Sequence, residues 1–345
     1  MTAATPSRER LPLALTCGEP AGIGFDVTLA AWTRRRETGL PPFYLLGSVE
    51  ALERRALHLG LDVPIRAATA ETAETVFDEA LPVVDLGLPC VGEPGRLDPT
   101  DAAVVIAAIE RAVDDVAQGR AAAVVTNPLH KHALYAAGFR HPGHTEFLGD
   151  LARRIAPPPD GVAWRPVMML AGPDMRTVPV TVHVSLAEAV RSLDSETIVA
   201  TGRIVAADLV RRFHIAAPRL AIAGLNPHAG ENGAMGREDI EVIAPAVARL
   251  RAEGIDARGP LSADTLFHAR ARATWDAALC MYHDQALIPV KTIAFDETVN
   301  VTLGLPFVRT SPDHGTALDI AGRGIAHPGS LIAALKMAAA MTRAA

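Results

Sequence analysis

Short apolar runs alternate with helical patterns along most of the chain, and this alternation constrains the fold more than any other feature. Helices are expected at about 26–36 and 100–118. Strands are expected at LPLALT (11–16), FYLLGS (43–48), PVVDLG (82–87), AAAVVT (121–126), PVMMLAG (166–172), VPVTVH (178–183), LAIAGLN (220–226) and AALCMYH (277–283). Because runs that are apolar on both faces belong to sheets covered on both sides, the pattern predicts an α/β fold with a mostly parallel sheet.

Composition narrows the class of protein. A chain of 345 residues can form one large or two medium domains, and a hydrophobic content of 49% is typical of a globular protein. The net charge of −6, without a basic stripe, disfavours nucleic-acid binding. The apolar runs are too short for a membrane span, and the amino terminus has no signal-peptide core, so a cytoplasmic protein is expected. Three distant cysteines indicate neither a disulfide framework nor a CxxC metal site.

Polar clusters rich in His, Asn and Gly follow five of the expected strands. In open α/β sheets, ligands bind beyond the carboxyl ends of the strands, and loops on a rigid scaffold often carry function. The sequence therefore predicts a functional site at the carboxyl ends of these strands. The clusters are TCGEPAGIG (16–24), TNPLHKHAL (126–134), TVHVSLAEA (181–189), GLNPHAGENG (224–233) and MYHDQ (281–285).

Three histidines stand at or just after the ends of apolar strands: His183, His228 and His283. They form no local motif such as HExxH, but imidazoles from three strand ends can converge in one crevice. Such a site leaves positions open for water or substrate, so a divalent ion bound there can polarise a hydroxyl or carbonyl oxygen. Taken singly, a histidine in such a chain is more often a surface or satisfied core residue, and it is the three equivalent positions together that make the metal site an equal alternative.

Candidate anion-binding residues are weaker signals. Thr145, in GHTEFLGDLARR, opens an expected helix whose amino terminus suits a phosphate, but a threonine there is often only a cap. Lys291, Asn300 and Arg309 flank the last histidine cluster, and Arg309 suits bidentate recognition of a phosphate or carboxylate. Each is also compatible with an ordinary solvated side chain. GEPAGIG (18–24) lacks the GxGxxG spacing, so it does not indicate a Rossmann site.

The chain contains, in order from about residue 11 to about 340, the motifs TCGEPAGIGFD, TNPLHKHAL, GHTEFL, GLNPHAGENGAMGRED, GPLSADTLF, MYHDQALIPVKTIAF and VNVTLGLPFVRTSPDHGTALDIAGRG. Together these motifs closely resemble the 4-hydroxythreonine-4-phosphate dehydrogenase family of vitamin B6 biosynthesis. GLNPHAGE and the last run are the most specific of them. One departure is visible, because many members read GDPAGIGPE where this chain has Glu19, Phe25 and Asp26. Phe25 thus replaces a proline that would favour a helix start.

The resemblance implies a three-layer α/β/α fold with two subdomains, like that of isocitrate and isopropylmalate dehydrogenases. The expected subdomains are 1–126 plus 305–345, on the cofactor side, and 127–304, on the dimer and metal side. The active site would lie between them at a homodimer interface, with both subunits contributing.

The resemblance also implies the site residues and cofactors. One divalent metal ion (zinc, magnesium or cobalt) would be held by the three histidines named above, and NAD or NADP would be the oxidant. The implied substrate contacts are His144, Thr145, Lys291, Asn300 and Arg309. A more distant likeness of DHGTALDIAGRGIAHPGSLIAAL (313–335) to the cofactor loop of isocitrate dehydrogenases implies contacts to the cofactor's adenosine part from His314, Gly315, Thr316 and Ala317.

The reaction implied is oxidation and decarboxylation of 4-phosphohydroxy-L-threonine to 3-amino-2-oxopropyl phosphate. Asp264, in GPLSADTLF, is a candidate for proton transfer, or alternatively a cap of a helix over TLFHARAR (265–272). The alternatives are a related dehydrogenase of 4-phosphothreonate, 4-phosphoerythronate or a cis-dihydrodiol carboxylate, and a metal-dependent phosphate-ester hydrolase. A non-catalytic binding module fits least, because so many anion contacts beside an open metal site exceed what binding requires.

Overall fold

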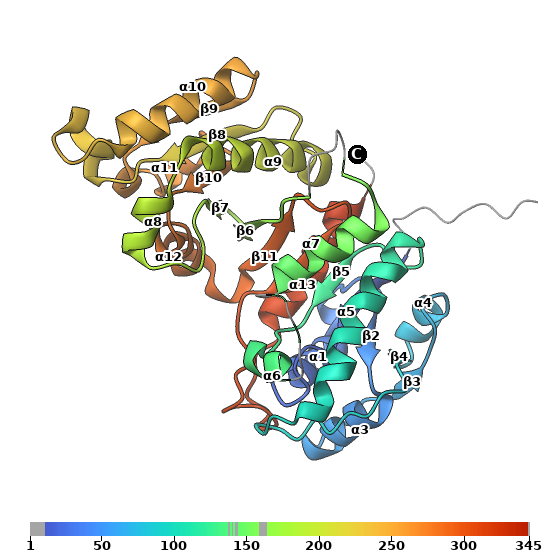
Figure 1. The fold of residues 1–345 in the computed structure, drawn as a ribbon. Coiled ribbons are helices and arrows are strands. Elements are labelled where there is room, and N and C mark those ends of the chain that lie inside the picture. Colours follow the sequence, from blue (N-terminus) through green and yellow to red (C-terminus); the bar gives the residue numbers. More distant parts are fainter. Residues whose placement is uncertain (1–10, 137–138, 140, 142–143, 159–163, 344–345) are drawn as a thin grey trace, which may run out of the picture. The chain divides into compact units, whose positions relative to one another are not determined.

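The computed structural model describes residues 11–136, 139, 141, 144–158 and 164–343 (Figure 1). The chain forms two compact units, Met1–Pro166 with Leu305–Ala345, and Val167–Gly304. The sequence analysis expected the second boundary at this place, but the first one at residue 126. Residues 127–166 belong to the first unit because α7 (His144–Ile155) packs against α5 (Ala102–Ala117) there. The roles assigned to the two subdomains stay predictions.

The first unit has a parallel sheet whose strands are ordered β3-β4-β2-β1-β5-β12. The central strands are buried along their whole length, which requires helices on both faces. The strands are β1 (Leu13–Thr16), β2 (Phe43–Gly47), β3 (Ile65–Ala67), β4 (Leu81–Asp85), β5 (Val124–Thr126) and β12 (Arg309–Pro312).

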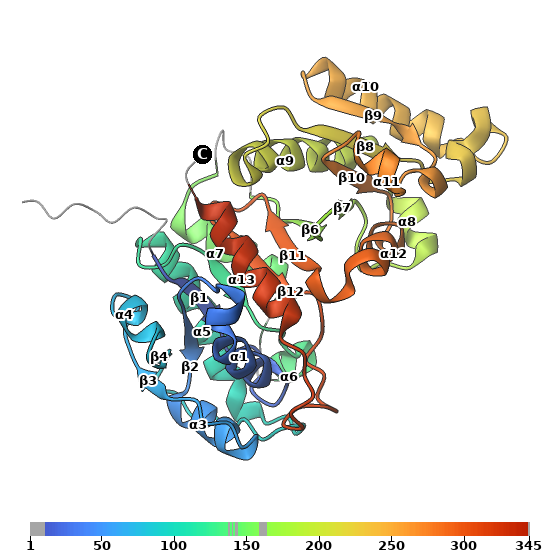
Figure 2. The same ribbon diagram turned by 180° about the vertical axis from the view of Figure 1, so that it is seen from behind.

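Helices supply that cover. α5 contacts β1, β2 and β5 on the face turned to the viewer in Figure 1, and α1 and α13 lie on the opposite face, seen in Figure 2. The bounds are α1 (Gly24–Thr33), α2 (Arg35–Thr38), α3 (Val49–His58), α4 (Ala73–Phe77), η2 (Pro99–Asp101), α6 (Lys131–Ala136) and α13 (Gly329–Thr342). Phe25 is fully buried at the start of α1, so the helix forms without the family's proline.

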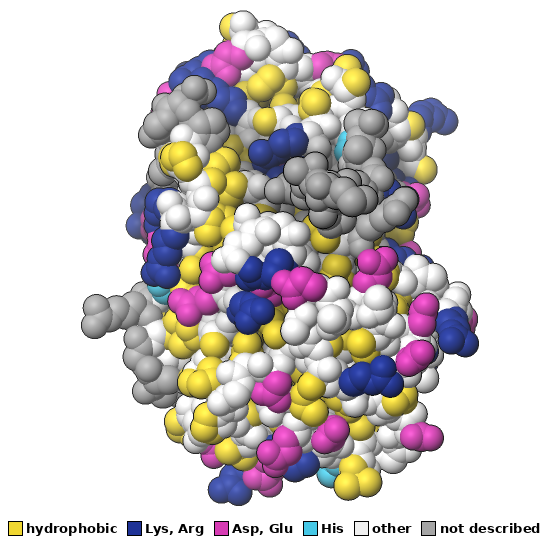
Figure 3. All heavy atoms as spheres, turned by 90° about the vertical axis from the view of Figure 1, so that its right-hand side faces the viewer, with side chains coloured by type: hydrophobic (Ala, Val, Ile, Leu, Met, Phe, Trp, Pro, Cys, Tyr) yellow, Lys and Arg dark blue, Asp and Glu magenta, His cyan; other side chains and the backbone are white. Residues whose placement is uncertain are grey.

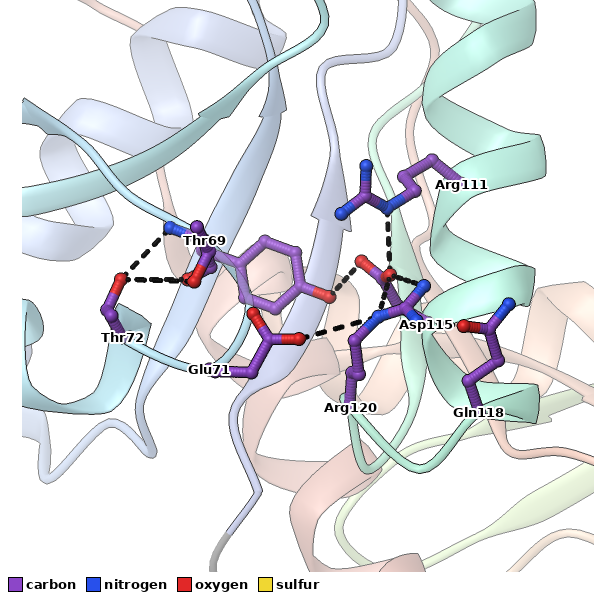
Figure 4. Close-up of polar contacts among 8 residues, drawn as sticks. Thr69, Glu71, Thr72, Arg111, Asp115, Gln118 and Arg120 are labelled. Carbon is purple, nitrogen blue, oxygen red and sulfur yellow. Dashed lines mark hydrogen bonds and ion pairs between the residues drawn. The ribbon is translucent and has the colours of Figure 1, made fainter.

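A buried carboxylate ties β2 to α5 and the loop that follows it. Asp115 is fully buried and accepts hydrogen bonds from the Tyr44 hydroxyl (2.7 Å), Arg111 Nε (2.8 Å) and Arg120 Nε (2.8 Å). Figure 4 shows Asp115 between the two guanidinium groups. Burial raises the pKa of Tyr44, and the adjacent carboxylate raises it further. The cluster satisfies a charge that would otherwise be unpaired in the core.

The second unit has a mixed sheet, ordered β11-β6-β7-β10-β8-β9. The adjacent strands β7, β10, β8 and β9 run parallel to one another. β6 is antiparallel to both of its neighbours, β11 and β7. The bounds are β6 (Val167–Ala171), β7 (Arg176–Pro179), β8 (Arg219–Ala223), β9 (Asp256–Leu261), β10 (Ala277–Cys280) and β11 (Val299–Leu303).

Three helices pack on this sheet: α9 contacts β6, β8 and β11, α12 contacts β6, β7 and β10, and α10 contacts β9. The remaining helical segments are short. The bounds are α8 (Leu186–Ser192), α9 (Ser195–Phe213), η4 (Pro227–Gly233), η5 (Asp239–Ile243), α10 (Ala244–Ala252), η6 (Ala263–Thr265), α11 (Ala269–Arg272), α12 (His283–Ala294) and η7 (Phe295–Glu297). The predicted three-layer α/β/α class is confirmed.

Three predicted strands end three or four residues earlier than expected. The run at 178–183 was expected to be a strand, but β7 covers Arg176–Pro179, β8 ends at Ala223 rather than at residue 226, and β10 ends at Cys280 rather than at residue 283. In each case the chain leaves the sheet, and His283 begins a helix instead. The histidines therefore lie on loops and a helix start beyond the sheet, not within it.

No helix among the described residues is long and apolar enough to cross a membrane. On the face seen in Figure 3, acidic and basic side chains are interspersed with hydrophobic ones.

Candidate active site at the carboxyl ends of parallel strands

The sheet of the second unit brings the three predicted histidines to one edge. β7, β10 and β8 are parallel neighbours, with Leu279 of β10 paired to Val178 on one side and to Ile222 on the other. Since the strands are parallel, their carboxyl ends meet at the same edge of the sheet. The loops that leave these three ends carry His183, His283 and His228 respectively.

Two of the imidazoles lie together. The ring centroids of His183 and His283 are 5.9 Å apart, and both side chains line a pocket of about 290 Å³ with Thr181, Tyr282 and Asp284. His283 Nδ1 lies 2.7 Å from Asp284 Oδ1. A carboxylate at one ring nitrogen fixes the orientation of the imidazole and leaves the other nitrogen for a ligand.

A second pocket adjoins the first, because His283 and Asp284 line both. It has a volume of about 470 Å³ and also contains Lys291, whose Nζ lies 5.6 Å from the centroid of the Phe295 ring. A lysine beside two histidines makes this edge of the unit suitable for an anionic ligand. The structure thus brings three of the predicted site residues into neighbouring pockets.

The third histidine lies on a loop with an unusual backbone. His228 and the next four residues have φ between 39° and 76°, the left-handed region that only glycine adopts easily, and only Gly230 among them is a glycine. Strained backbone of this kind is held in place by its surroundings and is found most often at functional sites. The sequence analysis identified the histidine but not this conformation.

Asp264 lies close to the histidine-bearing loop, since η6 packs against η4. The pKa of the Asp264 carboxyl lies below its ordinary value, chiefly because the Ser262 hydroxyl donates a 2.6 Å hydrogen bond to it, with a smaller contribution from the charge of His228. Asp264 is therefore ionised at neutral pH, although the lowered pKa makes its carboxylate a weaker base than an ordinary aspartate. The alternative that it caps a helix over 265–272 is wrong: α11 begins only at Ala269, and His268 caps it.

The structure does not assemble a complete metal site. Among the described residues, no three His, Cys, Asp or Glu side chains are grouped closely enough to hold a metal ion. His183 and His283 are together, and His228 belongs to the neighbouring loop. The donor set still fits a divalent ion, because three neutral imidazoles are good ligands for zinc or cobalt.

The other predicted substrate contacts are more scattered. Asn300 is half-buried on β11 of the second unit. In the first unit, Arg309 is buried at the start of β12 and donates a 2.6 Å hydrogen bond to the Thr126 hydroxyl. Burial lowers the pKa of Arg309 to about 10, so it remains charged at neutral pH. His144 and Thr145 begin α7, but their side chains lie outside the described part of the structure.

The predicted cofactor residues 314–317 form a loop of the first unit. The carbonyl oxygen of Thr316 accepts a 3.0 Å hydrogen bond from the Ile23 amide, and a Cβ on Gly22 would lie 2.7 Å from the same oxygen. Ala317 has a left-handed backbone, with φ of 44°. The loop therefore packs closely against GEPAGIG (18–24), the other glycine-containing loop singled out in the sequence.

The sequence did not reveal the residues that hold the histidine-bearing segments in place through hydrogen bonds. Asp284 and Gln285 are part of the MYHDQ cluster, but nothing in the pattern distinguishes their roles. Asp239 lies in GRED and is almost fully buried, with its carboxylate turned toward the backbone of the histidine-bearing loop. A buried acid cannot be recognised from sequence when its partners are backbone amides.

Comparison with known proteins adds independent evidence. A family model described as pyridoxal phosphate biosynthetic protein PdxA matches residues 40–338. A 4-hydroxythreonine-4-phosphate dehydrogenase of Bradyrhizobium diazoefficiens is 58% identical over 96% of this chain and 97% of its own. The crystal structure of a protein of that name from Klebsiella pneumoniae matches with a TM-score of 0.83 at 33% identity, over 96% and 98% of the chains. A terephthalate 1,2-cis-dihydrodiol dehydrogenase of Burkholderia xenovorans is more distant, with a TM-score of 0.63 and 28% identity over 96% and 98%.

Proposed function

The chain belongs to the PdxA family of pyridoxal phosphate biosynthetic proteins, and we propose that it oxidises and decarboxylates 4-phosphohydroxy-L-threonine to 3-amino-2-oxopropyl phosphate. The observation that carries the proposal is that three parallel neighbouring strands each lead into a histidine, at an edge that also holds a lysine. As a dehydrogenase of this family, the chain uses a nicotinamide cofactor, NAD or NADP. We expect it to act in the cytoplasm.

His183, His228 and His283 would hold one divalent metal ion, and Asp284 would orient His283 through the 2.7 Å contact. When bound, such an ion acts as a Lewis acid on the substrate hydroxyl and the adjacent carbonyl oxygen. We propose that Lys291, beside His283, binds an anionic group of the substrate and orients its C–H bond toward the nicotinamide.

The chemistry balances with the cofactor as the only oxidant. The alcohol carbon loses a hydride to NAD⁺ and its hydroxyl loses a proton, which gives a β-keto acid. The bond to the carboxylate then breaks, carbon dioxide leaves, and the resulting enolate carbon takes up a proton. Asp264 is the proposed group for proton transfer, because it lies in η6 beside the loop that carries His228 and is ionised at neutral pH.

The remaining assignments are proposals of the same kind. His144, Thr145, Asn300 and Arg309 would complete the binding of the phosphorylated substrate. The loop at 314–317 would lie against the adenosine part of the cofactor, supported by its tight packing on 18–24.

We also propose a homodimer formed through the second unit. Around the histidine pockets, α8 and α12 lie side by side (Figures 1 and 2). Large apolar side chains are exposed on both helices. Leu186 and Ile288 are each 62% exposed and Phe295 is 67% exposed, with Val184 and Val190 nearby in sequence. Grouped apolar side chains of this size on a protein surface are typical of interfaces. A partner on this surface would cover both pockets and exclude water from them.

The test is reduction of the nicotinamide, followed by its absorbance, with purified chain, NAD, a divalent metal and 4-phosphohydroxy-L-threonine. We expect reduction that a chelator abolishes and added metal restores. Reduction only with 4-phosphothreonate or 4-phosphoerythronate would move the assignment to a related dehydrogenase. Phosphate release without reduction would instead support a phosphate-ester hydrolase.

His228→Ala should abolish turnover while the chain remains folded.

A further inference from the structure

Gln285 makes two buried hydrogen bonds that the proposed chemistry does not use. Its side chain lies in the first turn of α12, and the residue is only 7% exposed. Its amide oxygen accepts a 2.6 Å hydrogen bond from the Met281 amide, and its amide nitrogen donates a 2.7 Å hydrogen bond to the Gly224 carbonyl. Met281 and Gly224 are themselves buried, so these bonds satisfy backbone groups that water does not reach.

The position of these bonds relates them to the histidines. β10 and β8 are paired through Leu279 and Ile222, and Met281 and Gly224 lie just beyond that pairing. Beyond this point the two segments diverge: the one after β10 leads to His283, and the one after β8 leads to His228. Gln285 joins them where the strand ladder no longer does. Its single side chain therefore links the starts of the two histidine-bearing segments.

The side chain of Asp239 also holds the loop after β8, which carries His228. The Asp239 carboxylate, 1% exposed, accepts hydrogen bonds from the amides of Leu225 (2.9 Å) and Asn226 (3.1 Å). Residues 224–226 are thus attached at consecutive backbone groups, immediately before the left-handed turn that contains His228. A turn with unfavourable backbone angles needs such anchoring to keep one conformation.

We propose that Gln285 is a positioning residue that sets the separation between the segments carrying His228 and His283, and thereby the affinity of the three-histidine site for a divalent metal. The inference rests on the proposed function and extends it to the residue that joins the two loops. An amide is suited to this task because one planar group offers both an acceptor and a donor. A side chain of similar length without these groups fills the space but leaves the loops unconnected.

The experiment is a titration of the metal-free full-length chain with Co²⁺, followed by visible absorption and calorimetry. Gln285→Met removes both hydrogen bonds at nearly constant volume. We expect it to bind Co²⁺ roughly 10- to 100-fold more weakly than the unmodified chain, the usual effect of losing a supporting contact behind a metal site. The visible spectrum should also change, because it reports the arrangement of the ligands. Gln118→Met is the matched control, since Gln118 is exposed beyond the end of α5. This variant should bind Co²⁺ with the same affinity as the unmodified chain.

Folding is verified by circular dichroism and thermal unfolding before each titration. If Gln285→Met does not fold, Gln285→Glu serves in its place, because it keeps an acceptor for Met281 and replaces only the donor to Gly224 by an oxygen. A folded variant with unchanged Co²⁺ affinity and spectrum would overturn the proposal while leaving the enzyme assignment intact. Conversely, Co²⁺ binding that depends on Gln285 in a chain that reduces no nicotinamide would support the positioning role and contradict the proposed reaction. An unmodified chain that binds no Co²⁺ would overturn both.

Discussion

Glu19 is a buried carboxyl group in the loop that precedes α1. The residue is 3% exposed, and its carboxylate accepts a 3.2 Å hydrogen bond from the Ala21 amide. Burial raises the pKa of Glu19 from 4.5 to about 7, and the negative charge of Asp101 adds to the effect. The group is thus largely protonated in the folded chain at slightly acid pH, unlike an ordinary glutamate.

This pKa predicts a pH-dependent stability. A carboxyl with a raised pKa binds more protons in the folded state than in the unfolded state. Its contribution to the free energy of unfolding is therefore fully present below pH 4.5 and is lost as the pH rises through about 7. Glu19→Gln is neutral at every pH. We therefore expect it to match the unmodified chain near pH 5 and to exceed its free energy of unfolding by up to about 3 kcal/mol at pH 8.

Urea unfolding at several pH values between 5 and 8 measures this difference. Glu79→Gln, at an exposed carboxylate, is the control and should show no comparable trend. A difference between Glu19→Gln and the unmodified chain that stays constant over this pH range would show that Glu19 titrates normally.

Tyr44 supplies one of the hydrogen bonds to the buried Asp115 carboxylate. Tyr44→Phe keeps the ring and removes the 2.7 Å hydrogen bond, so the carboxylate retains only its two arginines. Because a hydrogen bond to a buried charge stabilises more than an average one, we expect a loss of about 1.5–3 kcal/mol in the free energy of unfolding. Chemical denaturation measures it. Tyr135→Phe, at an exposed tyrosine, should change stability by less than about 0.5 kcal/mol.

At the scale of elements, the loop after β8 depends on a glycine that has no room for a side chain. A Cβ on Gly224 would lie 2.7 Å from Asp239 Oδ1 and 2.9 Å from the Ala229 Cα. Gly224→Ala must therefore displace either the anchoring carboxylate or the turn that carries His228. Since small misplacements of catalytic groups are costly, we expect kcat/KM to fall by about 100-fold.

The control for this variant is a glycine with strained backbone but open surroundings. Gly39, at the end of α2, has φ of 60° and no atom within 4 Å of an added Cβ. Gly39→Ala should cost about 1–2 kcal/mol of stability without loss of activity. Equal activity of Gly224→Ala and the unmodified chain would mean that the loop tolerates displacement and does not position a reacting group.

The elements of the site were predictable to different degrees. Apolar runs revealed β8 and β10, and the polar clusters after them pointed to His228 and His283, because strand ends collect function in α/β sheets. The ends of β7, β8 and β10 were placed too late, since the local sequence pattern continues past each strand and only tertiary packing turns the chain away. The link from Gln285 to Gly224 joins residues far apart in the chain and has no local signature.

At the scale of the whole chain, alternation of strands and helices predicted an α/β fold with a mostly parallel sheet, whereas the three layers and the two expected subdomains came from the family resemblance. Residues 127–166 were placed in the other subdomain, because helices between two sheets carry no mark of which sheet they join. Their packing on α5 decides it.

The proposed dimer gives the last prediction. Leu186 and Ile288 are both 62% exposed beside the histidine pockets, and a stable interface needs a grouped apolar surface of about 800 Å² per partner. The double variant Leu186→Asp with Ile288→Asp places charges where such an interface would exclude water, so light scattering should show twice the chain mass for the unmodified protein and a single chain mass for the variant. Leu57→Asp, at a leucine that is 82% exposed on α3 of the first unit, is the control and should leave the mass unchanged. If the double variant is folded and still dimeric, the chains associate through a different surface, and the histidine pockets must be closed by other means.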